Sequence, residues 1–194
     1  MYSQHVPVIR SYCMESPENL ASMVEFVLAT IQQGLSTVPM ILDDIRTNKD
    51  KSAFLFGSKR RGYRYLHDNK QVLFDSVSGC IDPVEAVSIF FQIDGIGAVK
   101  AGFCAQLLGF NTGCIDSHNL KLLGINPNAV SIPKSLKPAT RVKRLHDYVD
   151  LTHEVGGAQY LWDSWCSHVA GNQANKSLTT GFDVSKLHVE CIVR

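Results

Sequence analysis

The sequence predicts an all-α fold. Apolar residues recur at three- and four-residue intervals over most of the chain, which is the spacing of one face of a helix. Two of these segments begin with a capping residue followed by proline, a pair that favours helix starts, and strand patterns are scarce. At 194 residues the chain suits a single core, so we expect residues 1–194 to form one helical domain, either as one body or in two lobes.

The first part of the chain contains two predicted helices and one less regular segment. Residues 17–34 are predicted to form a helix capped by Ser16, and a second helix is predicted from residue 37 to about residue 48. Residues 55–65 show no clear helical pattern. We interpret their basic run, Lys59-Arg60-Arg61, as a turn between aromatic residues.

The middle of the chain has the sharpest pattern. Asp82 is a predicted cap for a helix that begins at Pro83, and the turn Gly95-Ile96-Gly97 ends that helix. A further helix is predicted from Ala98 to about Leu108. We therefore expect two helices joined by a glycine turn at about residues 83–110.

The rest of the chain is predicted to be helices separated by a loop. A short helix is expected at residues 117–123, and residues 126–138, which hold three prolines, are predicted to form a loop or linker. Helices follow at residues 139–155 and 158–169. The tail is polar and then apolar, which predicts a short strand or a docked end.

The composition excludes several classes of protein. No apolar run approaches the roughly 20 residues of a membrane span, and the N-terminus lacks the apolar core of a signal peptide, so we expect a cytoplasmic protein, or one of the host cytoplasm if it is viral. Six scattered cysteines include no Cys-x-x-Cys pair, so we expect neither a metal site nor a cofactor. The net charge of +1 means that local patches must supply any attraction to phosphate.

The glycine turn indicates an anion site. The backbone N–H groups in the first turn of a helix lack intrahelical partners, and the helix dipole favours negative charge there. Glycine lets a phosphate approach the backbone closely. Dinucleotide-binding folds also use such a turn, but they require a preceding strand, and here a helix is predicted to precede it.

Two segments resemble the helix-hairpin-helix DNA glycosylases of the endonuclease III type. Residues 93–97, Ile-Asp-Gly-Ile-Gly, resemble that family's Leu-Pro-Gly-Val-Gly hairpin, and residues 114–118, Cys-Ile-Asp-Ser-His, resemble its Val-Asp-Thr-His segment. The resemblance is close over residues 83–125 and loose elsewhere. It implies DNA as the partner, bound by a monomer, and an enzyme that flips a modified or damaged base out of the duplex and excises it.

The resemblance implies a catalytic role for Asp116, which matches the family's aspartate. That carboxylate activates the attacking nucleophile or stabilises the positive charge on the sugar as the base leaves. Some members also carry a lysine nucleophile, but its position here is Val99. Lys100 is adjacent, and one residue on a helix is a rotation of about 100°, so we do not expect it to point where the family's lysine points. The sequence therefore favours a monofunctional glycosylase that uses water.

The iron–sulfur cluster of many family members is not expected, because only Cys166 and Cys191 lie near the C-terminus.

Lys100 is interpreted as a phosphate contact, with a surface lysine and a shifted catalytic nucleophile as alternatives. Asp116 also suits the cap of the short helix at residues 117–123. The candidate DNA-binding residues are Gly95, Ile96, Gly97, Val99, Lys100, Lys59, Arg60, Arg61, His118 and Asn119.

Some of these candidates have alternative roles. The basic run at residues 59–61 suits either a grip on the DNA backbone or a solvated loop. His118 and Asn119 either order the active site or simply pack. Trp162 and Trp165, three residues apart on a predicted helix, favour a place in the core over stacking on a base.

The sequence is also compatible with two other functions. Bacteriophage proteins resembling these glycosylases have been proposed to attach an amino acid or polyamine to activated hydroxymethyluracil in DNA, which makes a transferase one alternative. A non-catalytic helix-hairpin-helix module that only holds phosphate is the other, and it predicts steep salt dependence without turnover.

Overall fold

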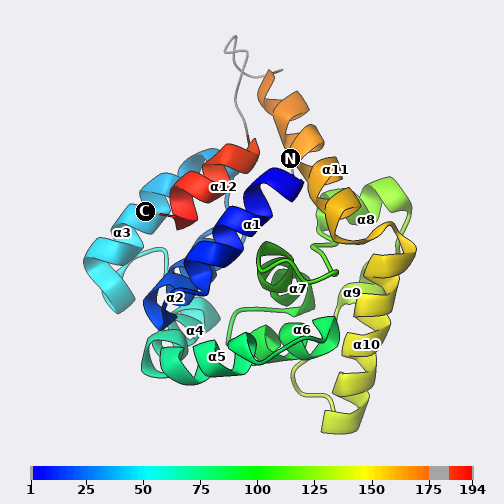
Figure 1. The fold of residues 1–194 in the computed structure, drawn as a ribbon, viewed down its shortest axis with the longest axis horizontal. Coiled ribbons are helices and arrows are strands. Elements are labelled where there is room, and N and C mark those ends of the chain that lie inside the picture. Colours follow the sequence, from blue (N-terminus) through cyan, green and yellow to red (C-terminus); the bar gives the residue numbers. More distant parts are fainter. Residues whose placement is uncertain (1, 175–183, 194) are drawn as a thin grey trace.

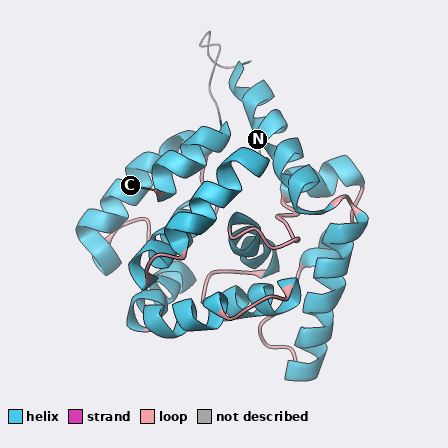
Figure 2. Cartoon of the chain, viewed as in Figure 1, coloured by secondary structure: helices cyan, strands magenta, loops and turns pink. Residues whose placement is uncertain are grey.

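The computed structural model describes residues 2–174 and 184–193. These residues form helices and connecting turns without a strand, which confirms the all-α prediction (Figure 2). The α-helices are α1 (Tyr2–Cys13), α2 (Pro17–Ala29), α3 (Val38–Asn48), α4 (Gly57–Asp68), α5 (Lys70–Ser78), α6 (Pro83–Phe91), α7 (Ala98–Leu107), α8 (Ser117–Leu123), α9 (Pro127–Val130), α10 (Pro138–Glu154), α11 (Gly157–Ala174) and α12 (Val184–Ile192).

Helix α7 lies at the centre of the fold. In Figure 1 it is surrounded by α1 and α2 on one side, α6 below, and α10 and α11 on the other side. Its residues from Ala101 to Leu107 are all buried, as expected for a helix that is enclosed by others. The part of α7 from Ala101 onward is therefore held in place by packing against its neighbours.

The helix starts agree well with the sequence signals. The backbone N–H of Asn19 donates to Ser16 Oγ at 3.2 Å at the start of α2, and Asp82 accepts from two backbone N–H groups at the start of α6. Helix α8 begins and ends as predicted. Helix α2 ends at Ala29, five residues before the predicted stop at Gly34.

Three segments differ from the sequence prediction. The basic run at residues 59–61 lies inside helix α4, so its interpretation as a turn is wrong. The predicted linker at residues 126–138 contains the short helix α9. The tail forms helix α12 and not a strand, but it is docked: it packs on α1, α2 and α11, and Arg46 Nη2 donates to the carbonyl oxygen of Cys191 at 3.0 Å.

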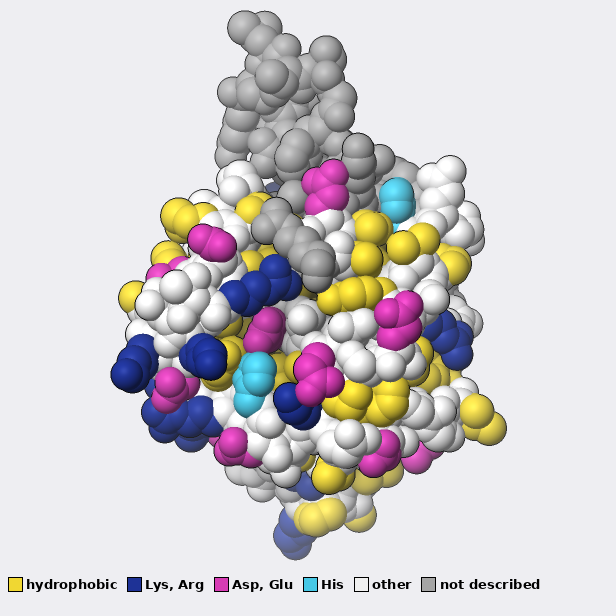
Figure 3. Space-filling model, turned by 60° about the vertical axis from the view of Figure 1, so that its left-hand side comes forward, with side chains coloured by type: hydrophobic (Ala, Val, Ile, Leu, Met, Phe, Trp, Pro, Cys, Tyr) yellow, Lys and Arg dark blue, Asp and Glu magenta, His cyan; other side chains and the backbone are white. Residues whose placement is uncertain are grey.

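The surface carries both signs of charge. On the face shown in Figure 3, Lys and Arg side chains are interspersed with Asp and Glu. The exposed ion pairs include Arg64 with Asp50 at 2.9 Å and Lys70 with Glu18 at 2.7 Å. Pairs of this kind stabilise a fold by only about 0–1 kcal/mol each. None of the helices in the described part of the chain is long and apolar enough to cross a membrane.

Candidate functional site

The glycine turn between α6 and α7 packs against helix α4 on one side. Gly95 has φ +81°, a conformation that side chains rarely adopt, and a Cβ there would lie 3.2 Å from the backbone of Lys59. On the opposite side of this contact, a Cβ at Gly62 would lie 1.9 Å from the carbonyl oxygen of Asp94. Gly97 is the exposed N-terminal cap of α7, with open space where a side chain would be. The first turn of α7 is therefore open at Gly97, while the other side of the turn is covered.

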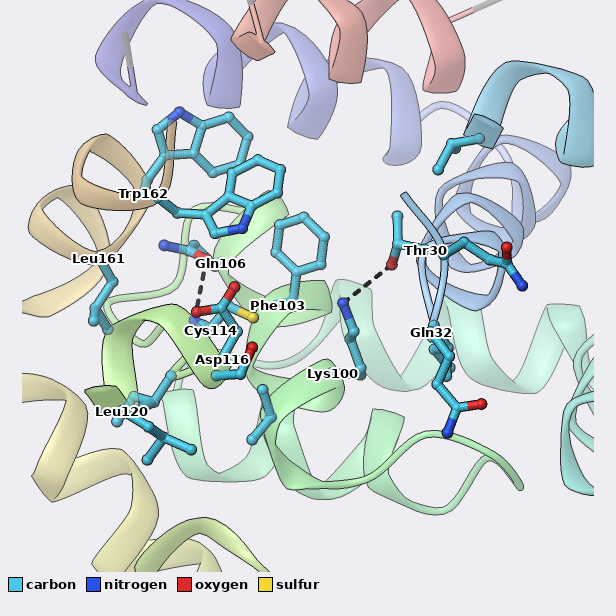
Figure 4. Close-up of a pocket in the computed structure, with 17 residues that line it drawn as sticks. Thr30, Gln32, Lys100, Phe103, Gln106, Cys114, Asp116, Leu120, Leu161 and Trp162 are labelled. Atoms are coloured by element: carbon cyan, nitrogen blue, oxygen red, sulfur yellow. Dashed lines mark hydrogen bonds between the residues drawn. The ribbon is translucent and has the colours of Figure 1, made fainter. Parts of the chain in front are cut away.

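A pocket of about 560 Å³ lies beside the first turns of α7 (Figure 4). Its walls come from the end of α2 and the following loop, from α7, from the segment before α8 and from α11. Val99 and Lys100, which follow the glycine turn, both line the pocket, and so does Asp116. Pockets of about 300–1,000 Å³ with apolar walls and a few polar groups are typical of small-molecule sites.

Lys100 reaches into this pocket from the first turn of α7. Its Nζ donates to Thr30 Oγ1 at 3.1 Å and lies 5.4 Å from the centre of the Phe103 ring. Thr30 in turn donates its hydroxyl proton to the carbonyl oxygen of Val27 at 2.7 Å. The amine is thus half-buried and oriented by the residue that follows α2, which argues against the alternative of a solvated surface lysine.

Asp116 caps helix α8 and also faces the pocket. Its Oδ1 accepts from the backbone N–H groups of His118 and Asn119, both at 3.0 Å, which confirms the predicted cap. Its Oδ2 has no hydrogen bond among the described residues. Among the described residues, Lys100 and Asp116 form no direct ion pair with each other. Figure 4 shows the pocket space between the two groups.

The segment that carries Asp116 is held in place by buried side chains of α7 and α10. Gln106 donates from Nε2 to the carbonyl oxygen of Ala158 at 2.7 Å and accepts at Oε1 from the backbone N–H of Cys114 at 3.2 Å. Tyr148 donates to the carbonyl oxygen of Gly113 at 2.6 Å. These bonds fix the backbone just before Asp116, so the carboxylate has little freedom to move.

Sequence reasoning missed Gln106, Tyr148 and Thr30. The bond from Gln106 to Ala158 spans 52 residues, the bond from Tyr148 to Gly113 spans 35, and Thr30 meets Lys100 across 70 residues. A single glutamine, tyrosine or threonine inside a helical pattern gives no signal of such a partner. Only the packing of α2, α7 and α10 brings these groups together.

Aromatic rings form the α11 side of the pocket. Trp162 belongs to the core and Trp165 packs against it, as the sequence favoured, and both also line the pocket. Trp162 is 2% exposed, and its ring lies 6.3 Å from that of Phe103. His188 of α12 is fully buried behind this wall, with its ring 4.9 Å from that of Trp162 and 5.2 Å from that of Trp165.

The three side chains of the basic run at residues 59–61 differ in their exposure to solvent. Lys59 is 5% exposed and donates from Nζ to the carbonyl oxygen of Ile31 at 2.7 Å, so its prediction as a surface phosphate contact is wrong. Burial, and secondarily the charge of Lys100, lowers the pKa of Lys59. Arg60 is half-buried, and its Nη2 donates to the carbonyl oxygen of Ser52 at 3.3 Å. Arg61 is exposed beside the glycine turn, where its Nε lies 2.8 Å from Asp94 Oδ2.

The two polar residues after Asp116 have structural partners. Asn119 is fully buried, donates to the carbonyl oxygen of Cys114 at 2.9 Å and accepts from Ser164 Oγ at 3.2 Å, so it is not available at the surface for DNA. The ring of His118 is stacked on that of His168, with centres 3.6 Å apart. Burial, followed by the charge of His168, lowers the pKa of His118. The side chain of Ile96, another candidate, is fully buried beneath the turn.

Cys114 is the thiol of the pocket wall. It is half-buried, and desolvation raises its pKa to about 12, against the opposing effect of the Lys100 charge. A thiol with this pKa is protonated at neutral pH and a poor nucleophile. In the described residues no three His, Cys, Asp or Glu side chains gather where they could hold a metal ion.

The chain was compared with protein-family models, with curated proteins and with solved structures, and no match was found. The function must therefore be argued from the pocket itself.

Proposed function

We propose that the protein is a DNA-base-acting enzyme, and that its reaction is hydrolysis of the N-glycosidic bond of a base flipped into the pocket. One observation carries this proposal: a carboxylate, Asp116, and an amine, Lys100, face one aromatic pocket beside an exposed helix N-terminus at Gly97. An enzyme that acts on a base inside a duplex needs a pocket for the extruded base and a grip on the phosphates next to it. Both features lie here beside the first turns of α7.

The chemistry follows from the environment of Asp116. As the bond between base and sugar breaks, the base leaves with the electron pair and positive charge grows on the sugar. The Oδ2 atom of Asp116 is free to stabilise that charge or to accept a proton from the attacking water. Water oxygen then forms the new bond to the sugar carbon. One water proton passes through the carboxylate to the departing base, and the other stays on the new hydroxyl group of the sugar.

The glycine turn supplies the phosphate contact in this proposal. No side chain caps α7 at Gly97, so the N–H groups of its first turn remain available to an anion. Arg61 is exposed next to the same turn, where it pairs with Asp94 and has further guanidinium N–H groups that suit a phosphate. The weak net charge of the chain is consistent with attraction that is local to this edge.

The test is an excision assay on duplexes that carry uracil, oxidised, alkylated or other modified bases. Strand breakage after alkali reports the abasic product. Asp116→Asn is expected to lower excision by at least a hundredfold because the amide cannot offset positive charge. Asp147→Asn, on the exposed face of α10 and paired with Lys143, is the matched control and is expected to leave excision unchanged. The proposal fails if no base is released, or if Asp116→Asn excises as well as the wild type.

A second candidate function is group transfer to an activated base. The half-buried position of Lys100 favours it, because an ammonium group in the pocket is suited to hold a phosphate leaving group. In this reaction the nitrogen of an amine bonds to the methylene carbon of phosphorylated hydroxymethyluracil, the carbon–oxygen bond breaks, phosphate leaves and the amine releases a proton. Incorporation of a labelled amine into DNA carrying that base tests it, and Lys100→Met is expected to abolish incorporation. Lack of transfer across a panel of amines would rule the candidate out.

Binding without turnover is the remaining possibility. A module that only holds phosphate would bind all duplexes alike, with affinity falling steeply as salt rises. Asp116 argues against it, because a carboxylate facing a phosphate site is repulsive.

A further inference from the structure

The indole nitrogen of Trp162 has no hydrogen-bond partner among the described residues. Trp162 is 2% exposed, and its Nε1 is fully buried without an acceptor. A buried N–H group without a partner costs roughly 1–3 kcal/mol, so such groups are rare and require an explanation. In Figure 4 the indole beside Phe103 turns its nitrogen toward the side of the pocket that holds Asp116, and Trp162 is the indole whose ring lies 6.3 Å from Phe103.

The other polar groups deep in the pocket are mostly satisfied by the protein. Both ends of the Gln106 amide are used, and the Thr30 hydroxyl donates to Val27 while accepting from Lys100. The exposed polar residues Gln32, Gln33 and Ser117 lie at the rim. The N–H donors left for a ligand therefore include the remaining protons of the Lys100 amine and the indole of Trp162, whose nitrogen is the buried one of the two pocket indoles.

We infer that Trp162 is a specificity-determining residue, which donates its indole N–H to a ring carbonyl oxygen of the bound base. A base with a carbonyl group supplies the missing acceptor, whereas a base without one leaves the N–H buried and unpaired. A site built to hydrogen-bond a substrate group rejects analogues that lack the group more strongly than an apolar site does. The inference rests on the proposed function, since it assumes that the ligand is a base.

The inference is tested by a thermodynamic cycle between Trp162 and the carbonyl group. Two duplexes carry, at one position opposite an abasic site, either thymine or its apolar shape mimic 2,4-difluorotoluene, each on a 2′-fluorinated sugar that resists excision. Their affinities for the wild type and for Trp162→Phe are measured by fluorescence anisotropy. The cycle cancels the differences between the duplexes that do not involve Trp162.

The wild type is expected to bind the thymine duplex on the order of tenfold more tightly, and Trp162→Phe is expected to lose most of that preference. Trp165→Phe removes the other indole of the pocket and is expected to alter both affinities alike. If Trp162→Phe folds poorly, benzothienylalanine is incorporated biosynthetically in place of Trp162, in a protein that also carries Trp165→Phe. This analogue removes the N–H while keeping the ring shape, and the same loss of preference is expected.

An unchanged preference in Trp162→Phe or in the benzothienyl protein would overturn the inference, whether or not the wild type excises bases. Equal binding of both duplexes by the wild type would do the same. A preference that depends on Trp162, found in a protein without excision, would support the inference while rejecting the glycosylase reaction. Failure of both duplexes to bind would overturn the inference and the proposed function together.

Discussion

Replacing Gln106 by methionine is expected to destabilise the protein strongly. The side chain is 1% exposed, and its amide makes one bond to the carbonyl oxygen of Ala158 at 2.7 Å and one from the N–H of Cys114 at 3.2 Å. Methionine has a similar volume, so packing is largely kept while both backbone groups lose their partners. Each buried group left unpaired costs roughly 1–3 kcal/mol. Because methionine gains some free energy from its apolar burial, we expect a net loss of about 3 kcal/mol.

Urea unfolding followed by circular dichroism measures this loss, with the free energy of unfolding taken from the midpoint and slope. For a chain of this size, about 3 kcal/mol corresponds to a fall in Tm of roughly 6–12 °C. Gln71→Met is the matched control, because Gln71 is exposed on α5 and bonds only to Asp75. Its expected effect is within about 0.5 kcal/mol. A loss below about 1 kcal/mol for Gln106→Met, or equal losses for the two variants, would refute the reasoning.

Three further changes have defined outcomes. Gly62→Ala is expected to lower the Tm by several degrees, because its Cβ would lie 1.9 Å from the carbonyl oxygen of Asp94 and either α4 or the glycine turn must shift. Tyr148→Phe leaves the carbonyl oxygen of Gly113 without its 2.6 Å hydrogen bond and is expected to cost about 1–2 kcal/mol in urea unfolding. His118→Gln is expected to weaken the fall of stability at acid pH, because the pKa of His118 is lowered in the folded state. The neutral imidazole therefore contributes its full stabilisation above the unfolded pKa of about 6.5, and this stabilisation is lost as the pH falls through the folded pKa.

Each of these changes has a control on the surface. Gly79→Ala adds a Cβ only 3.7 Å from its nearest neighbour, an ordinary contact, and a loss like that of Gly62→Ala would contradict the packing argument. Tyr160→Phe removes a hydroxyl from a 44% exposed ring and is expected to be neutral. His146→Gln alters an exposed histidine on α10 and is the control for His118→Gln. The Tm of each variant is measured from pH 7.5 to 5.5. A change in the profile of His146→Gln but not of His118→Gln would contradict the role of the stacked pair.

Local signals in the sequence predicted the helices that begin with strong caps. Ser16, Asp82 and Asp116 act within three residues of their own position, so their effect is visible without knowledge of the fold. The helix at residues 57–68 was missed because its exposed face is dense in charge, and its buried face holds Lys59 and Gly62, which do not look like core residues. Tertiary contacts decided that segment, and the sequence pattern does not contain them.

The same division applies to the candidate site. Asp116 and Lys100 were both singled out from the sequence, but the pattern could not decide where Lys100 points. Its direction depends on Thr30, which directly follows the last residue of α2. Asn119 was expected either to order the active site or to pack, and it is buried with partners in the protein. Lys59 was expected in a grip on DNA or in a solvated loop, and it is buried and bonded to Ile31. Residue type near a motif therefore predicted the carboxylate and the amine, and it failed where burial was decisive.

The position of His188 behind the tryptophan wall has a consequence for how the protein is made. A growing chain leaves the ribosome from its N-terminus, and the early helices begin to fold while later ones are still being added. The turn that binds phosphate in our proposal and the aspartate that follows it are both present by residue 116, whereas the support for Trp162 and Trp165 arrives with α12, at residues 184–192. The pocket is therefore completed only after α12 has been synthesised, and a nascent chain that already carries both charged groups still lacks the backing of its aromatic wall.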